Sequence, residues 1–383
     1  MRGFPPAPQE QVTLANWRTP PFNKWAFHHV REILPTAEIA SDPADVMALP
    51  SEPIDSAELG IDEFLRATDT DGLVILRRGK KVFEHYANGM TADTPHILMS
   101  VTKSMLGLLA GVLAARGMLN VDRLVTDILP ELKETAYRGA TVRNLLDMRA
   151  GIAFDEDYLA TSGPIAVYRK ATGWNPLQPG EAASDLRAFY RELRDSDGPH
   201  GGRFKYVSPN TDLLGWVIER ATGRRYAELM SELLWKPLGA RRSAYITVDR
   251  LGAPRCAGGM CATVEDLARA GQLMLDAGRR GGAEVLPASW IEDIARNGDP
   301  AAWAAGSFVG YFPGLPMSYR SKWYVLKEDA PLLFGWGIHG QHLFVDRRSE
   351  IVIAKASSQA LPIDAGRIAL TLKALAQIRE RLS

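Results

Sequence analysis

Several features that would point to particular classes of protein are scarce or missing in this sequence. Its 383 residues include two cysteines, Cys256 and Cys261, too few for a disulfide scaffold. We expect both to be buried free thiols in a reducing compartment. The longest apolar run, MLGLLAGVLAA, falls well short of the ~20 residues that a membrane-spanning helix needs. The N-terminal MRGFPPAPQEQVTLANW has no apolar core of a secretory signal. A cytoplasmic location is therefore the expectation.

An excess of charge of either sign is also absent. Lys plus Arg number 45 and Asp plus Glu number 45. This balance gives no electrostatic reason to expect nucleic acid or an anionic membrane as a partner. A small-molecule partner remains, and the chain itself is expected to be a monomer or a homodimer.

Common catalytic signatures are missing as well. No serine has glycine at both −2 and +2, so the nucleophile elbow of the α/β-hydrolases is excluded. There is no H-E-x-x-H, and His339 and His342 have no obvious carboxylate or cysteine near them in the sequence. No phosphate loop or dinucleotide fingerprint occurs. We expect neither a metal nor a cofactor.

The segments with clear patterning indicate an α+β fold. Residues 72–78 and 81–86 are β-rich runs separated by Gly79-Lys80, a hairpin signal. Strand patterns return at 332–356, and an amphipathic helix at 362–381 closes the chain. Because the strand signals stand near both ends, they predict one central antiparallel sheet flanked by helices.

The middle of the chain looks mainly helical, with TVRNLLDM and NTDLLGWVIERATG as its clearest helices. The predicted organisation is an irregular arm at 1–50, an α/β domain from 51–130 and 245–383, and an inserted helical domain at 131–244. A cleft at the seam between the two domains is the expected place for a site.

Ser100 and Lys103 stand three residues apart in LMSVTKSMLGLLAGVLAARG, at the start of an apolar helix that Gly117 should end. An ordinary helix cap followed by an ordinary lysine explains this spacing. A nucleophile explains it too. The helix N-terminus favours developing negative charge, and a lysine one turn later, desolvated among apolar neighbours, could accept the serine proton.

Two later segments could complete such a site. Tyr206 lies in a glycine-rich loop before a helix, GGRFKYVSPNTD, where its phenol could handle a proton. An aromatic packed under the loop explains it equally well. The strand FGWGIHGQHLF is interrupted by glycines, which often marks close backbone approach and could supply an oxyanion donor. Tyr324, with Trp323 and Trp336, could line an acyl pocket.

The order of these motifs, together with ATVRNLLDMRAGI, resembles the serine-reactive penicillin-recognising family of class C β-lactamases, DD-peptidases and family VIII carboxylesterases. The stretches WRTPPFNKWAFHH, DEDYLA, YVSPNTD, TVEDLARAGQLMLD and GIHGQHLF resemble its subgroup of nylon-oligomer hydrolases almost end to end. The resemblance implies the β-lactamase/transpeptidase-like fold.

The resemblance also implies roles. Ser100 would be the nucleophile, Lys103 its proton-handling partner and Tyr206 the general acid/base. The backbone N–H groups of Ser100 and Ile338 would form the oxyanion hole. Tyr158, in DEDYLA, matches a loop tyrosine that can hydrogen-bond an amide leaving group. The expected substrate-binding residues are Tyr158, Arg169, Tyr324 and His339.

Two departures bear on the substrate. Ser208 follows Tyr206-Val207 where β-lactamases have asparagine, and GWGIHG replaces their Lys-Thr-Gly, so a β-lactam carboxylate would lack its cation. Arg169 stands where the nylon-oligomer hydrolases carry an acidic residue. That reversal should repel an amino-terminated oligomer and could attract a carboxylate.

The sequence thus predicts a serine hydrolase that forms an acyl-enzyme, acting on carboxylic esters first and on linear amides second. The alternatives are an acyl-trapping scaffold with little turnover and a β-lactamase.

Overall fold

A seven-stranded sheet joins two stretches that are far apart in the chain. The computed structural model describes residues 1 and 3–383. The strand order is β3-β2-β13-β12-β11-β10-β9, and every neighbouring pair is antiparallel, as the sequence predicts. The strands are β2 (Thr70–Arg77), β3 (Lys80–Tyr86), β9 (Met317–Arg320), β10 (Trp323–Leu326), β11 (Leu332–Gly337), β12 (Gln341–Asp346) and β13 (Ile351–Ser357).

The predicted β2–β3 hairpin is confirmed, but its turn lies one residue earlier than expected. Arg77 pairs with Lys80, so Arg78 and Gly79 form the turn, with φ of 49° and 74°. Two consecutive positive φ values suit the right-handed twist of a hairpin. Glycine supplies one of them without strain, and the arginine adopts the other.

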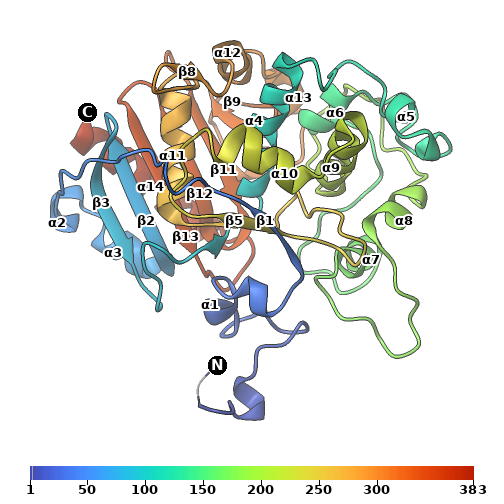
Figure 1. The fold of residues 1–383 in the computed structure, drawn as a ribbon, viewed down its shortest axis with the longest axis horizontal. Helices are drawn as coiled ribbons and strands as arrows, with labels where there is room; N and C mark the ends of the chain where they lie inside the picture. Colours follow the sequence, from blue (N-terminus) through green and yellow to red (C-terminus); the bar gives the residue numbers. More distant parts are fainter. Residues whose placement is uncertain (2) are drawn as a thin grey trace.

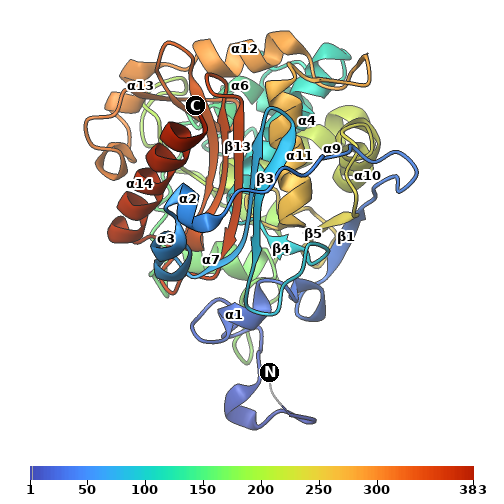
Figure 2. The ribbon, with the colours of Figure 1, turned by 90° about the vertical axis from the view of Figure 1, so that its left-hand side faces the viewer.

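Helices cover both faces of this sheet (Figures 1 and 2). Leu73 and Ile75 of β2 belong to one core cluster. That cluster also contains buried side chains of α14 (Ala365–Leu382), α2 (Ser56–Leu59) and α3 (Asp62–Ala67). Val74 and Leu76 join the cluster of α4 (Val101–Ala115) and α11 (Val264–Leu275) on the other face. The alternation follows from the two-residue period of a strand. It buries β2 from Thr70 to Leu76.

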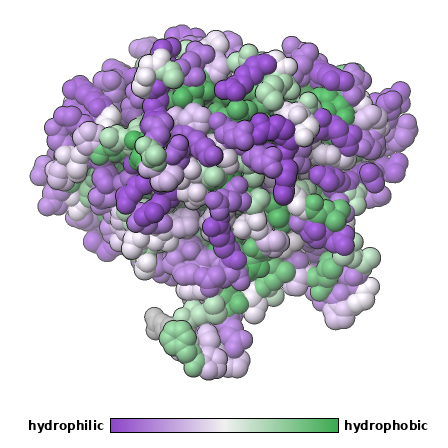
Figure 3. All heavy atoms as spheres, viewed as in Figure 1, coloured by the Kyte–Doolittle hydropathy of each residue, from purple (hydrophilic) through white to green (hydrophobic). Residues whose placement is uncertain are grey.

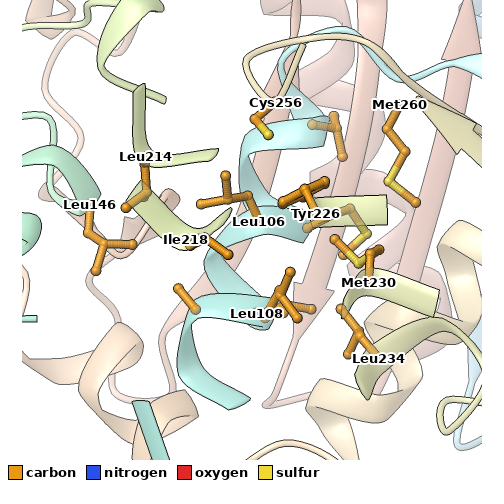
Figure 4. Close-up of a cluster of buried hydrophobic side chains, with 14 of the residues drawn as sticks. Leu106, Leu108, Leu146, Leu214, Ile218, Tyr226, Met230, Leu234, Cys256 and Met260 are labelled. Carbon is orange, nitrogen blue, oxygen red and sulfur yellow. The ribbon is translucent and has the colours of Figure 1, made fainter. Parts of the chain in front are cut away.

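The helix after Ser100 is the predicted one, and it lies at the centre of the molecule. Gly117, at φ 68°, follows its last turn. Leu106 and Leu108 of α4 pack among side chains of α9 (Pro209–Thr222) and α10 (Tyr226–Met230), which include Leu214, Ile218 and Met230 (Figure 4). Apolar packing on all sides fixes this helix, and therefore fixes the residue at its start.

The middle of the chain is mainly helical, as expected, and both of its clearest predicted helices are present. TVRNLLDM forms α6 (Val142–Leu146), whose N-cap Thr141 makes a capping box with Asn144. NTDLLGWVIERATG forms most of α9, ended by Gly223 at φ 69°. The other helices there are α5 (Val125–Ile128), α7 (Pro164–Ala171) and α8 (Leu186–Arg191). The domain boundaries at 130/131 and 244/245 stay predictions.

A second, four-stranded antiparallel sheet was not predicted. Its order is β1-β5-β6-β4, from β1 (Thr36–Ile39), β5 (Ala244–Thr247), β6 (Met260–Ala262) and β4 (His96–Ile97). The arm at 1–50 is therefore not wholly irregular, because it contributes β1 and the short helix α1 (Asn23–Ala26). Strand β4 leads directly into Ser100, so this sheet helps to position the start of α4.

The remaining elements are short. They are α12 (Ala288–Arg296), α13 (Pro300–Ala304), β7 (Arg279–Arg280), β8 (Ala283–Glu284), a π-helical turn at Ser231–Trp235, and 3₁₀ turns at Pro8–Glu10, Val30–Glu32, Pro130–Leu132, Val309–Tyr311 and Ile338–Gly340.

The surface seen in Figure 3 is mainly hydrophilic, with scattered apolar patches. Within residues 1 and 3–383, no helix combines the length and apolarity that crossing a membrane requires. Cys256 and Cys261 are free and buried, as expected.

Candidate active site

Ser100 is held at the junction between strand β4 and helix α4. Met99 adopts a left-handed backbone, with φ 44°, and turns the chain sharply from the strand into the helix. Ser100 occupies the N-cap position, yet its side chain makes no capping hydrogen bond. The ordinary cap, one of the two explanations of this serine, is therefore wrong. The hydroxyl is directed to other groups.

Lys103 supplies the first of those groups. Its Nζ donates to Ser100 Oγ at 2.8 Å and to the Ala257 carbonyl oxygen at 2.6 Å. The side chain is 1% exposed. Burial lowers the pKa of Lys103 to about 7. The carboxylates of Glu156 and Asp212 oppose this change, whereas the charge of Arg255 adds to it. An amine with this pKa is substantially neutral at physiological pH, so it can accept the serine proton.

Tyr206 approaches the same pair from the loop before α9. Its ring centroid lies 4.8 Å from Lys103 Nζ. Burial raises the pKa of the Tyr206 phenol, while the neighbouring Ser100 and Tyr324 hydroxyls oppose that rise. The phenol is therefore protonated at neutral pH and can act as a proton donor. Lys103, from the same helical turn, and Tyr206, from a distant loop, thus both lie close to the Ser100 hydroxyl.

The glycine-rich strand β11 lies directly against the start of α4. A Cβ on Gly337 would stand 2.8 Å from the Leu98 carbonyl oxygen, and one on Gly335 would stand 2.8 Å from Ser104 Oγ. The glycines thus allow close approach to the nucleophile helix. In the described part of the chain, the Ser100 backbone N–H donates to no acceptor. Ile338, which follows Gly337, lines the space beside Ser100.

Ser100 lines two pockets, called here the aromatic pocket and the arginine pocket after their side chains. Both also contain Tyr158 and Ile338. The aromatic pocket adds Tyr206, Phe308, Tyr324, Trp336, Gly337 and Ile363. The arginine pocket adds Arg18, Met99, Glu156, Ile165, Tyr168, Arg169, Trp174, Ser208, Arg255, Ala257 and Gly258.

Arg169 and Tyr158 are linked within the arginine pocket. The Arg169 guanidinium donates to the Ala160 carbonyl at 2.7 Å and to the Tyr158 carbonyl at 2.8 Å. It thereby ties the loop that carries Tyr158 to α7. Burial raises the pKa of the Tyr158 phenol, and the nearby Glu156 carboxylate adds to the rise. Both residues lie where the sequence predicts.

Of the two other expected substrate-binding residues, Tyr324 lines a pocket at Ser100 and His339 does not. Tyr324 lines the aromatic pocket together with Tyr206, and Trp336 lines the same pocket, whereas Trp323 is fully buried elsewhere. The structure does not place His339 in either pocket. Its ring Nδ1 lies 2.7 Å from the Gln359 carbonyl oxygen, and its ring packs against Phe27 of the arm. A left-handed backbone at φ 60° accompanies this orientation.

Sequence reasoning missed a layer of buried charge behind the lysine. Asp212 Oδ1 accepts the Ala257 N–H at 2.6 Å, and its other oxygen pairs with Arg255. Ala257 in turn offers its carbonyl to Lys103. Asp212 therefore holds the backbone at Ala257, whose carbonyl oxygen orients Lys103. Glu156 and Arg18 were also missed, although both lie in stretches that carried the resemblance, DEDYLA and WRTPPF.

The described residues contain no cluster of side chains suited to bind a metal ion. Residues 1 and 3–383 contain no group of three or more His, Cys, Asp or Glu side chains that could hold an ion. The chemistry available at Ser100 is nucleophilic and acid–base chemistry by protein groups.

Comparison with known proteins agrees with this geometry. The family model described as Beta-lactamase matches residues 61–378. The chain is 36% identical over 362 residues to the 6-aminohexanoate-dimer hydrolase of Paenarthrobacter ureafaciens, covering 93% of this chain and 90% of the relative. It is 29% identical to esterase EstB of Burkholderia gladioli over 187 residues, 46% of this chain and 45% of the esterase.

The fold has a close structural match. A Bacillus anthracis protein assigned as a 6-aminohexanoate-dimer hydrolase superposes with a TM-score of 0.88 at 26% identity, covering 98% of each chain. The α+β architecture is thus the β-lactamase/transpeptidase-like fold expected from the sequence. With the family model matching most of its length, the chain belongs to the beta-lactamase family.

Proposed function

We propose that this protein is a serine hydrolase that cleaves carboxylic esters, and linear amides more slowly, through an acyl-enzyme on Ser100. The observation that carries the proposal is the 2.8 Å contact between Lys103 Nζ and Ser100 Oγ, with the lysine buried and its pKa lowered to about 7. A hydrolase and an esterase among the relatives support the same class of reaction.

The acylation step follows from the positions of three side chains. Neutral Lys103 accepts the hydroxyl proton while Ser100 Oγ attacks the substrate carbonyl carbon. Negative charge develops on the carbonyl oxygen, and the backbone N–H groups of Ser100 and Ile338 stabilise it. Tyr206 then donates its phenolic proton to the leaving oxygen or nitrogen, and the Ser100–acyl ester remains.

Deacylation reverses these roles with water as the nucleophile. The phenolate left at Tyr206 removes a proton from water, which attacks the acyl carbon, and protonated Lys103 returns its proton to the departing Ser100 oxygen. Esters are the better substrates because an alkoxide departs with less protonation than an amine needs. Tyr158, beside both pockets, is the group that could assist an amine.

The wider setting of the site is also proposed. The reaction takes place in a cleft between an α/β domain (51–130 and 245–383) and an inserted helical domain (131–244). The substrate is a small molecule. We place the protein in the cytoplasm as a monomer or homodimer, in keeping with its two buried free cysteines.

Substitution of the nucleophile tests the proposal. Ser100→Ala should lower the turnover of p-nitrophenyl butyrate by several orders of magnitude. The matched control is Ser104→Ala, because Ser104 lies one turn further along the same helix and lines neither pocket. Wild-type turnover by Ser100→Ala would refute the mechanism.

Counting product separates an enzyme from an acyl-trapping scaffold. A hydrolase releases many equivalents of p-nitrophenol per chain after any initial burst. Release that stops at one equivalent, with a stable acyl adduct on Ser100 by mass spectrometry, would instead show a trap.

A further inference from the structure

The side chains that line the arginine pocket carry more positive than negative charge. Three guanidinium groups line it, from Arg18, Arg169 and Arg255, and Glu156 is the one carboxylate in the lining. Arg255 is paired with Asp212, which lies behind it. In the described part of the chain, Arg18 and Arg169 have no carboxylate within salt-bridge distance. Two cations thus face the pocket without a counterion.

Glu156 is already engaged by a neutral donor. Its Oε2 accepts the Ser208 backbone N–H at 2.8 Å, and the Tyr158 phenol lines the pocket with it. It forms no ion pair with Arg18 or Arg169. The pocket therefore keeps an excess of positive charge next to the nucleophile.

Arg18 is fixed in position by the N-terminal arm. Its guanidinium carbon lies 5.4 Å from the ring centroid of Trp17 and 5.6 Å from that of Trp174, and one of its nitrogens donates to Asn175 Oδ1. Trp17 is 1% exposed, and its indole N–H donates to the Trp174 carbonyl at 3.1 Å. The aromatic rings leave this side chain little freedom, so its charge is pre-positioned.

The arginines also carry unused donors. The Nε atoms of Arg18 and Arg255 are buried and have no hydrogen-bond partner among residues 1 and 3–383. Burial, together with repulsion from Arg169 and Arg255, lowers the pKa of Arg18 to about 9. Arg18 is half-buried and its one side-chain partner is the neutral Asn175, so a ligand that supplies an anion would offset the cost of desolvating its charge.

The position of the proton donor decides which half of a substrate enters this pocket. Tyr206 lines the aromatic pocket and not the arginine pocket. Because Tyr206 must reach the leaving atom, the leaving group occupies the aromatic pocket, against Phe308, Tyr324 and Trp336. The acyl chain then extends from Ser100 into the arginine pocket.

We propose that the arginine pocket binds a carboxylate at the far end of the acyl chain, with Arg18 as a specificity-determining residue supplied by the arm. The preferred substrates are then half-esters of dicarboxylic acids with apolar or aromatic leaving groups. This inference rests on the proposed function, since it assigns the two ends of a substrate cleaved at Ser100.

A charge series of esters provides the first test. The probes are p-nitrophenyl half-esters of succinic, glutaric and adipic acids, the same compounds with the distal carboxylate methylated, and p-nitrophenyl 4-(trimethylammonio)butyrate. For at least one chain length, kcat/KM should be highest for the anionic ester and lowest for the cationic one. Equal kcat/KM values for anionic and methylated esters at every length would overturn the inference and leave the proposed function intact.

Substitution of Arg18 provides the second test. Arg18→Gln should lower the anionic-to-methylated ratio of kcat/KM roughly 10- to 100-fold, the loss expected for a charge-assisted hydrogen bond. Arg31→Gln is the matched control, because Arg31 belongs to the same arm, stacks 4.0 Å over Tyr245 and lines neither pocket. An Arg18→Gln variant that lowers both kcat/KM values equally would count against a role in charge recognition.

Binding measurements keep the inference testable without turnover. Titration calorimetry with glutarate should show affinity for Ser100→Ala that falls at least about tenfold in Ser100→Ala/Arg18→Gln. Circular dichroism checks that both variants are folded. Equal glutarate affinity in the two variants would refute the carboxylate site, whereas a wild-type protein that hydrolyses no ester but binds glutarate through Arg18 would refute only the proposed reaction.

Discussion

Gly337 approaches Ser100 so closely that a Cβ on the glycine would stand 3.0 Å from the Ser100 backbone nitrogen. That nitrogen is one of the two proposed oxyanion donors. The φ of Gly337 is −124°, so the constraint at this position is steric and does not come from a left-handed backbone. Strand β11 and helix α4 can therefore come close enough to form the proposed oxyanion hole only because one position lacks a side chain.

Gly337→Ala should disrupt ester hydrolysis more than it disrupts folding. The added methyl group would push β11 away from Ser100, and loss of one oxyanion donor typically lowers kcat about 100- to 1,000-fold. The measurement is kcat for p-nitrophenyl butyrate, with thermal unfolding in parallel. Gly310→Ala is the control, since a Cβ there meets nothing within 4 Å. Unchanged kcat in Gly337→Ala would argue against the donor pair.

The pH dependence of hydrolysis should report the ionisation of Lys103. Its pKa is lowered to about 7, mainly by burial, so the amine is protonated and unable to accept a proton below that pH and is neutral above it. With a neutral ester, kcat/KM should rise with pH through about 7 and then level off. A stopped-flow or steady-state profile from pH 5 to 9 measures this, and a flat profile would contradict a lysine base.

Asp212 should be among the most sensitive positions for stability. Asparagine there would leave Arg255 buried without its counterion and would turn an amide donor toward the guanidinium. Breaking a buried pair in this way typically costs about 3–5 kcal/mol of the free energy of unfolding. Urea denaturation of Asp212→Asn measures the loss.

Glu131→Gln serves as the comparison for Asp212→Asn. Its partner Arg220 is 42% exposed and Glu131 itself is 31% exposed, so the loss should stay below about 1 kcal/mol. Similar losses in the two variants would show that the Asp212–Arg255 pair contributes no more than a surface pair.

The predictable part of the site was carried by short-range patterns. Ser100 and Lys103 share one helical turn, and Gly117 ends that helix, so local spacing was enough to place both side chains on one face. The order of Tyr206 and the glycine-rich strand matched a known family. The long strands are β-rich apolar runs and α14 is amphipathic, which is why the main sheet and its last helix were predicted.

What the sequence did not reveal depends on contacts between distant residues. Strand β4 is two residues long and has no readable period, so the second sheet was missed. Arg18 meets Trp174 across more than 150 positions, and nothing local marks it as a pocket residue. His339 was among the expected substrate-binding residues, but its ring is directed to Gln359 and Phe27.

The link between Arg169 and the Tyr158 loop predicts a specific kind of non-additivity. If Arg169 acts on a neutral substrate only by holding Tyr158 in place, Arg169→Met and Tyr158→Phe remove the same assistance to an amine leaving group. Each single variant should lower kcat/KM for a neutral p-nitroanilide about 100-fold and for the matching p-nitrophenyl ester much less. The double variant should be no worse than either single variant, because the second change removes nothing that remains. Arg66→Met, on the distant helix α3, controls for the loss of a surface arginine. Losses that multiply in the double variant would mean that Arg169 contacts the reacting amide independently of Tyr158.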